Sequence, residues 1–399
     1  MNLCYNTSIK RKIYNLDKIL NNKNINLYKS VKYRRNYYNK KYNVKLNNLP
    51  YSNFDYNNIY NKNCENVIGY INIPVGLVGP LKVNNKKHFI PIATTEGALV
   101  GSINRGSGFI HKCSIDGLHS ISIDKGISRA PLLDIKDIQN IPIFDNFIKS
   151  SYNDIKTIFN STSSYINLTD ISLHYNGSKV HIRFSATTGN AMGMNMISKS
   201  CEKTIEYILS IFPHFKLLTL SGNVCTDKKP SAINWIKGRG KTVIVNTKLD
   251  IDTYQKYSDI KVDDLVKLNI QKNLIGSSLA GSIGGMNAHS SNIIAGIFAA
   301  TGQDLAQVGT SSVGITDYSI DKNILNIDLT MPSLEVATIG GGTTIHSQRQ
   351  CLNIINIKNT LELSSVIAST VLCGELSLMT ALCKGNLVSS HIKLNRGII

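Results

Sequence analysis

Four short segments place ionisable side chains among glycines or other small residues. They are Thr94-Thr-Glu-Gly97, Asp227-Lys-Lys-Pro230, Gly302-Gln-Asp304 and Ser389-Ser-His391. A carboxyl group of raised pKa can act as a general acid, a lysine can stabilise an oxyanion, and a histidine titrates near neutral pH. Taken alone, each segment favours a structural role, such as a helix cap, a solvated loop, a hydrogen-bond acceptor or a polar tail. The surroundings of these residues must therefore decide.

The elements expected around these residues are short and rich in glycine. Residues 94–104 predict the start of a helix of small residues, and 293–300 predict an apolar helix that ends near Asp304. A charged residue at the end of so apolar a helix needs a partner, because burying an unpaired carboxylate is costly. Asp304 is therefore a site candidate on this ground alone. A loop rich in Gly, Lys and Pro is expected over residues 221–240.

The remaining pattern indicates an α+β chain. Residues 1–64 are polar, with weak helical periodicity around Ile13–Leu20, and the β-branched residues, Gly and Pro of 65–80 predict short strands and turns. Residues 115–190 alternate apolar and polar side chains, which predicts an antiparallel sheet, with a helix near Tyr152–Asn160. The later half is helical and interrupted by glycines.

Composition bounds the function classes. The 399 residues carry a net charge of +18, yet no zinc-finger spacing or basic zipper accompanies it, so a nucleic-acid partner is not expected. Eight cysteines without a CxxC pair resemble reduced thiols rather than a metal site, and no metal is predicted. The apolar run Ser364–Cys383 contains Glu375 and small polar residues, which predicts a buried helix and no membrane span.

Seven segments of the chain form an ordered set of motifs. These segments are Glu65-Asn-Val-Ile-Gly-Tyr70, Thr94-Thr-Glu-Gly97, Asn190-Ala-Met-Gly-Met-Asn-Met196, Asp227-Lys-Lys-Pro-Ser-Ala-Ile-Asn-Trp235, Gly302-Gln-Asp304, Ile339-Gly-Gly-Gly-Thr343 and His391-Ile-Lys-Leu-Asn-Arg396. They occur in the order found in 3-hydroxy-3-methylglutaryl-CoA reductases, and the chain resembles class I of that family between Asn63 and Arg396.

The resemblance implies a fold and its divisions. It implies a large substrate-binding domain with an inserted ferredoxin-like NADP-binding domain and a small helical N-terminal segment. Matched to this sequence, the N-terminal segment is 1–64, the large domain is 65–129 and 231–399 with a C-terminal catalytic flap, the insertion is 130–220, and an active-site loop is 221–230. The family also implies a homodimer with shared active sites, within a homotetramer.

The implied activity is the reduction of 3-hydroxy-3-methylglutaryl-CoA to mevalonate and CoA with two NADPH, in the mevalonate pathway of isoprenoid and sterol biosynthesis. Lys228 is expected to stabilise charge on the carbonyl oxygen, and Glu96 to protonate the aldehyde oxygen. Asp304 would hold these two in register, and His391 would protonate the departing CoA thiolate.

The resemblance also assigns the binding residues. Those expected to bind substrate are Arg129, Ser221, Asp227, Lys229, Lys272, Ser102, Asn104, Arg105 and Tyr28. Those expected to bind NADPH are Ser163, Asn190, Met192, Gly193, Met194, Asn195, Met196, Asn395 and Arg396. Without the family, the pattern of the methionine-rich run favours core packing.

Three residues depart from the family pattern. Asn190 stands where Asp is usual, and Ser164 stands where an Arg is usual, so a strict preference for NADPH over NADH is less well supported. Gly397 stands where many members carry a regulatory Ser, so that phosphorylation switch is expected to be missing. A cytoplasmic location is expected for the chain as given, or association with the endoplasmic reticulum membrane if it is a piece of a longer protein.

Two interpretations of other classes remain open on the sequence. One is a binder that retains the CoA pocket without turnover, against which the four intact candidate residues Glu96, Lys228, Asp304 and His391 argue. The other is a basic RNA-associated protein, which the net charge alone supports.

Overall fold

The structure is a computed structural model that describes residues 27–59 and 62–385. Its strands are β1 (Val75–Val83), β2 (Lys86–Ala93), β3 (Ser114–Arg129), β4 (Leu132–Asp134), β5 (Asn167–Asn176), β6 (Lys179–Thr187), β7 (Lys216–Thr219), β8 (Gly240–Asp250), β9 (Gly285–Met286), β10 (Gly314–Asp321) and β11 (Ile324–Leu334). Its longer helices are α2 (Leu27–Tyr42), α3 (Leu99–Cys113), α4 (Asn140–Ser150), α5 (Tyr152–Asn160), α6 (Met194–Ile211), α11 (Ser290–Thr301), α13 (His346–Ile355) and α14 (Thr360–Cys383).

Shorter helical segments connect these elements. They are η1 (Tyr56–Asn58), α7 (Ala232–Lys237), α8 (Ile251–Ser258), α9 (Val262–Leu268), η2 (Asn269–Gly276), α10 (Ser277–Leu279), η3 (Leu305–Gln307), α12 (Val308–Ser311) and η4 (Gly341–Thr344). The expected α+β character is confirmed. Residues 221–240 were expected to form a loop throughout, but they contain helix α7. The Gly and Pro content of the segment hid this short helix, which ends at Gly238.

One long strand joins the two parts of the sheet. The strand order is β7-β4-β6-β3-β8-β11-β10-β9, with β1 and β5 beside it. Strand β3 pairs with β8 up to Gly126, opposite Gly240, and from Ile127 onward it pairs with β6. Gly126 has φ +69°, and a Cβ there would lie 2.5 Å from the carbonyl oxygen of Ala186. This change of partner therefore requires glycine.

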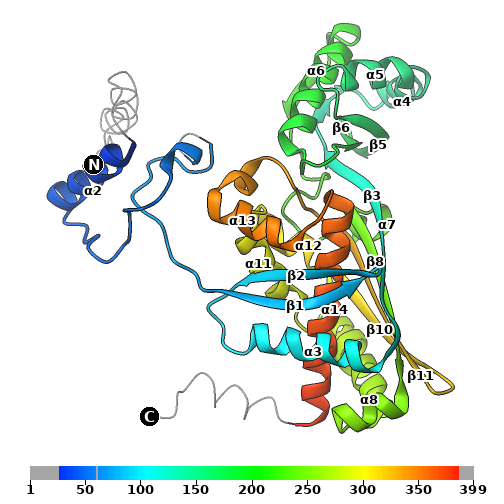
Figure 1. Ribbon diagram of the computed structural model, residues 1–399. Coiled ribbons are helices and arrows are strands. Elements are labelled where there is room, and N and C mark those ends of the chain that lie inside the picture. Colours follow the sequence, from blue (N-terminus) through cyan, green and yellow to red (C-terminus); the bar gives the residue numbers. More distant parts are fainter. Residues whose placement is uncertain (1–26, 60–61, 386–399) are drawn as a thin grey trace.

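Two hydrophobic cores lie on either side of this change of partner. The larger is built around α14, which packs on α3, α11, β3 and β8. The smaller is formed by residues from Ile127 to Phe215, including Phe144, Phe159 and Phe184. Figure 1 shows α4, α5 and α6 grouped at one end of the molecule and α3 and α8 at the other. The alternating pattern of residues 115–190 thus does form an antiparallel sheet, and α5 spans Tyr152–Asn160 as expected.

Helix α14 is the buried helix expected from the sequence. Among the described residues it is the one helix long and apolar enough to cross a membrane, and 78% of its most apolar stretch is buried inside the protein. The Glu375 carboxylate on this helix is completely buried and accepts hydrogen bonds from the backbone N–H groups of Ala288 and His289, at 2.6 and 2.8 Å. The carboxylate therefore satisfies donors that precede α11.

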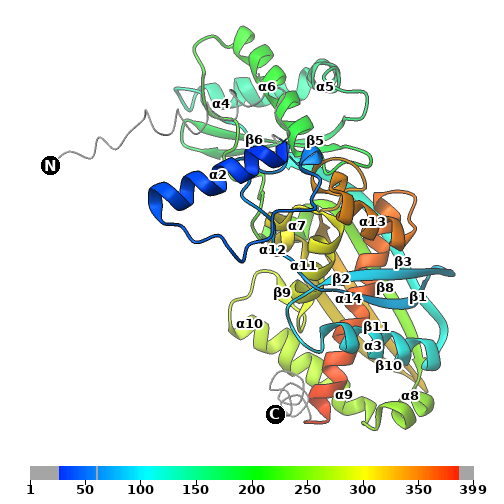
Figure 2. The same cartoon turned by 60° about the vertical axis from the view of Figure 1, so that its left-hand side comes forward.

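The N-terminal part of the described chain is a small separate cluster. Val31, Tyr56, Ile59 and Val67 form its core, which packs against Ile345. Figure 2 shows α2 at the side of the molecule, away from α8 and α9. The periodicity around Ile13–Leu20 lies outside the described residues.

One expected boundary was wrong. The helix expected from Thr94 begins only at Leu99, because Ala98 takes a left-handed conformation at φ +73° and residues before it form a turn. Of the short strands and turns expected over residues 65–80, the structure has one strand, which begins at Val75.

Gly106 sets the closest approach of α3 to α14. A Cβ on Gly106 would lie 1.8 Å from the carbonyl oxygen of Cys373, whereas a Cβ on Gly108, two residues later, would meet nothing within 4 Å. We expect Gly106→Ala to lower the free energy of unfolding by about 1–3 kcal/mol or more through overpacking. Gly108→Ala should raise it by roughly 0.5–1 kcal/mol, because alanine favours the helix. Thermal or denaturant unfolding of both variants measures this, and equal effects would contradict the close approach.

Candidate active site

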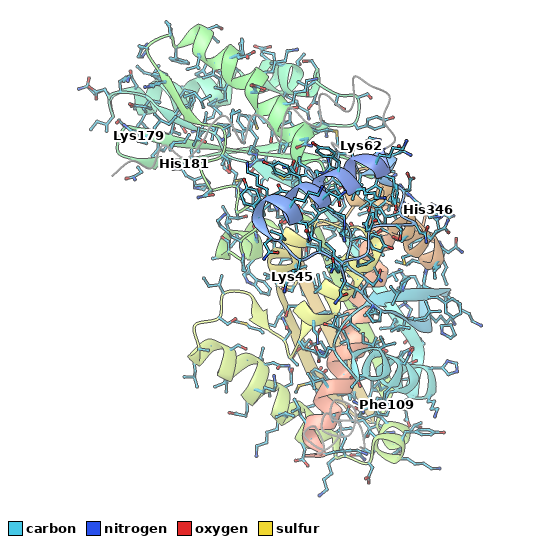
Figure 3. All side chains as sticks on the ribbon, turned by 90° about the vertical axis from the view of Figure 1, so that its left-hand side faces the viewer. Lys45, Lys62, Phe109, Lys179, His181 and His346 are labelled. Carbon is cyan, nitrogen blue, oxygen red and sulfur yellow. The ribbon has the colours of Figure 1, made fainter. Side chains whose placement is uncertain are left out.

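A cleft of about 600 Å³ opens where the two parts of the sheet meet. Its walls come from segments far apart in the sequence. The lining residues are Lys62, Asn63, Arg129, Ala191, Met192, Gly193, Met194, Asn195, Met196, Asp227, Lys228, Gly302, Gln303, Asp304, Ala337, Ile339, Gly340, Gly341, Gly342 and Thr343. Figure 3 shows Lys62 beside α2, on the same side of the molecule as His346.

Strand pairing explains why these segments meet. The C-terminal end of β3, the start of β8 and the end of β11 lie at one edge, because the three strands pair antiparallel with Gly126 opposite Gly240 and Lys241 opposite Leu334. Arg129 ends β3, and Asp227 and Lys228 lie on the segment that leads to β8. The segment after β11 completes this side of the cleft.

Glycines from two segments, Gly302 and Gly340–Gly342, form the wall beside Asp304. Gly302 ends α11 with φ +71°, and a Cβ there would lie 2.3 Å from the carbonyl oxygen of Gly342. The two backbones are in contact, so neither position accepts a side chain without movement. Gly342 of the triple-glycine motif therefore has a steric reason, whereas a Cβ on Gly340 or Gly341 would meet nothing within 4 Å and these two positions favour glycine through φ values of +77° and +54°.

Helix α6 begins at the cleft. Gly193, at φ +94°, precedes its first residue, and a Cβ there would meet the Thr188 side chain at 2.2 Å. The first N–H groups of a helix have no partner within it and favour anionic groups. The run Met192–Met196 thus brings a helix N-terminus and close backbone approach to the cleft wall.

Asp227 is held from three directions. The Gln307 side-chain amide donates to its Oδ1 at 2.9 Å, the Arg239 guanidinium approaches the same oxygen at 3.4 Å, and that of Arg129 approaches Oδ2 at 3.8 Å. Arg129 also donates to the Ser221 hydroxyl at 3.0 Å. The Lys229 ammonium donates to the Asp227 carbonyl at 3.2 Å. Four residues expected to bind substrate therefore form one connected group, Arg129 at the end of β3 and Ser221, Asp227 and Lys229 of the loop 221–230.

The expected catalytic residues are only partly assembled. Lys228 and Asp304 line the cleft, and both are exposed. Glu96 is also exposed but does not line it; its Oε2 accepts from the Asn292 amide at 2.7 Å. Within the described part of the chain, no hydrogen bond or ion pair joins Glu96 to Lys228 or Asp304. His391 lies outside the described residues, as do Asn395, Arg396 and Gly397.

The expectation that Asp304 is a buried carboxylate in need of a partner was wrong. Gly302 turns the chain outward after α11, so Asp304 is exposed and its Oδ1 caps the short helix η3 by accepting from the Ala306 N–H at 3.0 Å. The same argument fits Glu335, which follows strand β11 and is completely buried. Sequence reasoning missed Glu335, although a charge at the end of an apolar strand was the available signal.

Several expected binding residues lie away from the cleft in this chain. Ser102 and Arg105 bond Ser377 on α14, Asn104 bonds Gly79, and Lys272 donates to Asn273 at 3.2 Å. Tyr28 stacks on Tyr51 at a ring-centroid distance of 5.5 Å. One cleft within one chain does not bring together all the residues expected to bind substrate.

The expected cofactor residues divide in a similar way. Ser163 donates a hydrogen bond to the Met196 sulfur at 3.6 Å, next to the cleft, whereas Ser164 is exposed. Asn190 has a structural part: its Oδ1 accepts from the N–H of Thr360, the first residue of α14, at 3.2 Å, and its carbonyl accepts from Thr338 at 2.9 Å. Asn190 thus ties the cofactor run to the core helix.

A completely buried ion pair lies behind the cleft. Arg239, just before β8, contacts Glu335, just after β11, and neither side chain is exposed. Burial is the largest influence on the pKa of Glu335 and raises it, Arg239 opposes the rise, and the negative charges of Asp227 and Asp304 add to it; together they bring the pKa to about 7. Arg239 also contacts Asp227, so this pair is connected to the cleft.

The fold and cleft define a mixed α+β protein with a large mixed sheet and a cleft that Arg129, Lys228 and Asp304 help to line. Residues 30–396 match the family model described as hydroxymethylglutaryl-coenzyme A reductase. The chain belongs to the hydroxymethylglutaryl-coenzyme A reductase family, which confirms the resemblance seen in the sequence.

Relatives of several eukaryotes support this membership. The chain is 46% identical to 3-hydroxy-3-methylglutaryl-coenzyme A reductase 1 of Dictyostelium discoideum over 84% of the chain and 62% of that relative. It is 42% identical to reductase 1 of Oryza sativa subsp. japonica, over 85% and 66%, and 44% identical to the reductase of Agrotis ipsilon, over 86% and 42%. The chain thus spans less than two thirds of the length of these relatives.

A solved structure shares the fold. The class II 3-hydroxy-3-methylglutaryl-CoA reductase of Streptococcus pneumoniae, bound to NADPH in open conformations, superposes with a TM-score of 0.66 at 19% identity, covering 80% of this chain and 87% of that one.

The raised pKa of Glu335 predicts how stability depends on pH. Between the ordinary pKa of 4.5 and about 7, the folded state keeps the Glu335 proton and the unfolded state loses it. The free energy of unfolding should therefore fall as pH rises through this window, and Glu335→Gln should abolish that contribution. From pH 5 to pH 8, the melting temperature of the wild type should fall relative to that of Glu335→Gln.

Glu362 supplies a control of opposite sign. Burial raises its pKa, but hydrogen bonds from Lys86 and from the Lys358 N–H outweigh burial, so the net pKa is lowered. The stability that it contributes is present above its unfolded-state pKa and is lost as pH falls. Relative to Glu362→Gln, the wild type should gain stability with rising pH on the acid side. A flat difference for Glu335→Gln would contradict the raised pKa.

Proposed function

We propose that this chain reduces 3-hydroxy-3-methylglutaryl-CoA to mevalonate and CoA with two NADPH, as the catalytic part of a reductase of the mevalonate pathway. The observation that supports the proposal is the cleft, whose lining includes Lys228, Asp304 and the run Met192–Met196. Family membership supplies the reaction, and the cleft supplies a cation and a cofactor wall within one cavity.

The residues of the cleft suit the cofactor and the acyl substrate. Gly193 and the N-terminus of α6 would hold NADPH, which supplies a hydride in each of the two reductions. Arg129, Ser221, Asp227 and Lys229 form the connected group that would bind the hydroxymethylglutaryl end, with Arg129 as a bidentate donor to its carboxylate. Arg129 and the lysines also suit a polyanionic ligand.

The chemical steps follow from where charge develops. The first reduction puts negative charge on the carbonyl oxygen, and the Lys228 ammonium would stabilise it. The hemithioacetal then collapses: its C–S bond breaks, the thiolate of CoA leaves, and His391 would supply the proton that it takes up. In the second reduction Glu96 would protonate the oxygen of the aldehyde as it becomes the alcohol.

The domain assignments carry over to this proposal. We take residues 130–220, which contribute most of the smaller core, as the ferredoxin-like NADP-binding insertion, and 65–129 with 231–399 as the large domain. Residues 221–230 would be the connecting loop of the active site, and 1–64 the N-terminal segment. We also propose that the chain is located in the cytoplasm.

A homodimer with shared active sites would complete the site. Glu96 and Lys272 lie away from the cleft of their own chain. Exposed apolar side chains flank the loop: Ile236, Leu279 and Ile283 are 83%, 85% and 57% exposed. Large apolar side chains gathered at a surface are typical of an interface. In this proposal, contact through the surface that carries Ile236, Leu279 and Ile283 brings Glu96 of one copy against Lys228 of another, within a dimer or a tetramer.

Lys228→Ala should reduce turnover by about 10²-fold or more, because the ammonium stabilises charge that develops only in the transition state. The measurement is the fall of NADPH absorbance on adding 3-hydroxy-3-methylglutaryl-CoA, with NADH run in parallel. Lys87→Ala, an exposed lysine of β2, is the control. A wild type that consumes no NADPH would refute the proposed function, and near-normal turnover of Lys228→Ala would remove Lys228 from its role.

Mixing two inactive variants tests the shared site. If Lys228 and Glu96 of one site come from different chains, Lys228→Ala and Glu96→Gln subunits together form mixed dimers with one intact site. Random mixing should restore about a quarter of wild-type activity, since half the dimers are mixed and each has one working site of two. The variants are unfolded, mixed and refolded together. No recovery in proven mixed dimers would show that both residues act within one chain.

A further inference from the structure

The buried pair of Arg239 and Glu335 is the strongest feature that the proposed chemistry does not use. Both side chains have no exposed surface. They are brought together by pairing of β8 with β11, in which Lys241 lies opposite Leu334. Ion pairs of this kind contribute little net stability, because desolvation offsets their attraction, and apolar replacements are often as stable. Core stability therefore does not account for the pair.

Arg239 connects Glu335 to the walls of the cleft. One terminal nitrogen contacts Glu335; the other approaches Asp227 Oδ1 at 3.4 Å and the Met194 sulfur at 3.2 Å. Its Nε donates to the Ser128 hydroxyl at 3.2 Å, and that hydroxyl donates to the carbonyl of Cys225 at 2.9 Å. One planar group thus reaches the catalytic loop twice and the cofactor run once.

The loop that it reaches has an unfavourable backbone. Thr226 and Lys228, on either side of Asp227, take left-handed conformations at φ +56° and +63°. Such conformations cost roughly 1–3 kcal/mol each and persist only where the surroundings hold them. Asp227 lies between these two residues, and Arg239 contacts its carboxylate.

We propose that Arg239 and Glu335 are positioning residues for the reduction: Glu335 fixes the plane of the Arg239 guanidinium, and Arg239 holds Asp227 and with it the backbone that presents Lys228. This inference rests on the proposed function. The nearby Lys241 pairs with Asp124 at 2.7 Å, so it is not the cation that neutralises Glu335. Glu335 is therefore the anion that orients Arg239.

Two variants keep size while removing one property each. Glu335→Gln removes the charge, and Arg239→Lys keeps the charge but loses the planar fork. We expect each to lower kcat by about tenfold or more, and Glu335→Gln to leave the KM for NADPH within about threefold of wild type. Ile327→Val, a buried core change earlier on β11, is the control for lost stability alone. It should lower the melting temperature without lowering kcat.

A second measurement does not depend on activity. Trypsin cleaves after Lys228 when the loop opens, so cleavage there should be faster in Glu335→Gln and Arg239→Lys than in wild type and Ile327→Val, measured well below each melting temperature. An inactive wild type would refute the proposed function, and the rate of trypsin cleavage after Lys228 would then still test whether Arg239 and Glu335 position the loop. Unchanged cleavage, or kcat within twofold of wild type in an active enzyme, would overturn the inference.

Discussion

The change of partner in strand β3 is the constraint on which the rest of the structure depends. Up to Gly126 the strand belongs to the large sheet, and from Ile127 it belongs to the smaller one. Because the strand is continuous, the two cores are fixed relative to each other at that point, and the cleft opens beside it. A side chain at position 126 would collide with the backbone of β6, so the junction depends on glycine.

The antiparallel register then decides which charges meet. Arg239 precedes β8 and Glu335 follows β11, so pairing of those strands buries the two charges together, directly behind Asp227. The low dielectric of the interior makes each of these groups sensitive to its neighbours. A carboxyl whose pKa lies near 7 and a permanently charged guanidinium thus lie buried behind a cleft whose wall presents Lys228.

The sequence predicted elements whose pattern is local. Helices α5 and α14 and the antiparallel sheet follow from periodicity, and the family follows from motifs in order. The place of single charges was predicted less well, because burial depends on pairing between distant segments. Asp304 is exposed because Gly302 turns the chain toward the surface, whereas Glu335 is buried because it directly follows β11. Glu96 and Lys228 share no contact in one chain, and no pattern within one chain specifies which residues a second copy would supply.

The loop of residues 221–230 combines a fixed backbone with a lysine side chain that has no partner in the described part of the chain. Asn223, Thr226 and Lys228 all take left-handed conformations, which non-glycine residues rarely adopt. Fixed elements hold the loop at each step: the Thr226 hydroxyl donates to Asn234 on α7 at 2.7 Å, and Asp227 is held by Gln307 and Arg239. Within the described residues, the Lys228 ammonium makes no hydrogen bond or ion pair of its own. A cation whose backbone is held while its head stays free can meet charge that appears on a substrate oxygen with little reorganisation, which is the condition for electrostatic stabilisation of a transition state.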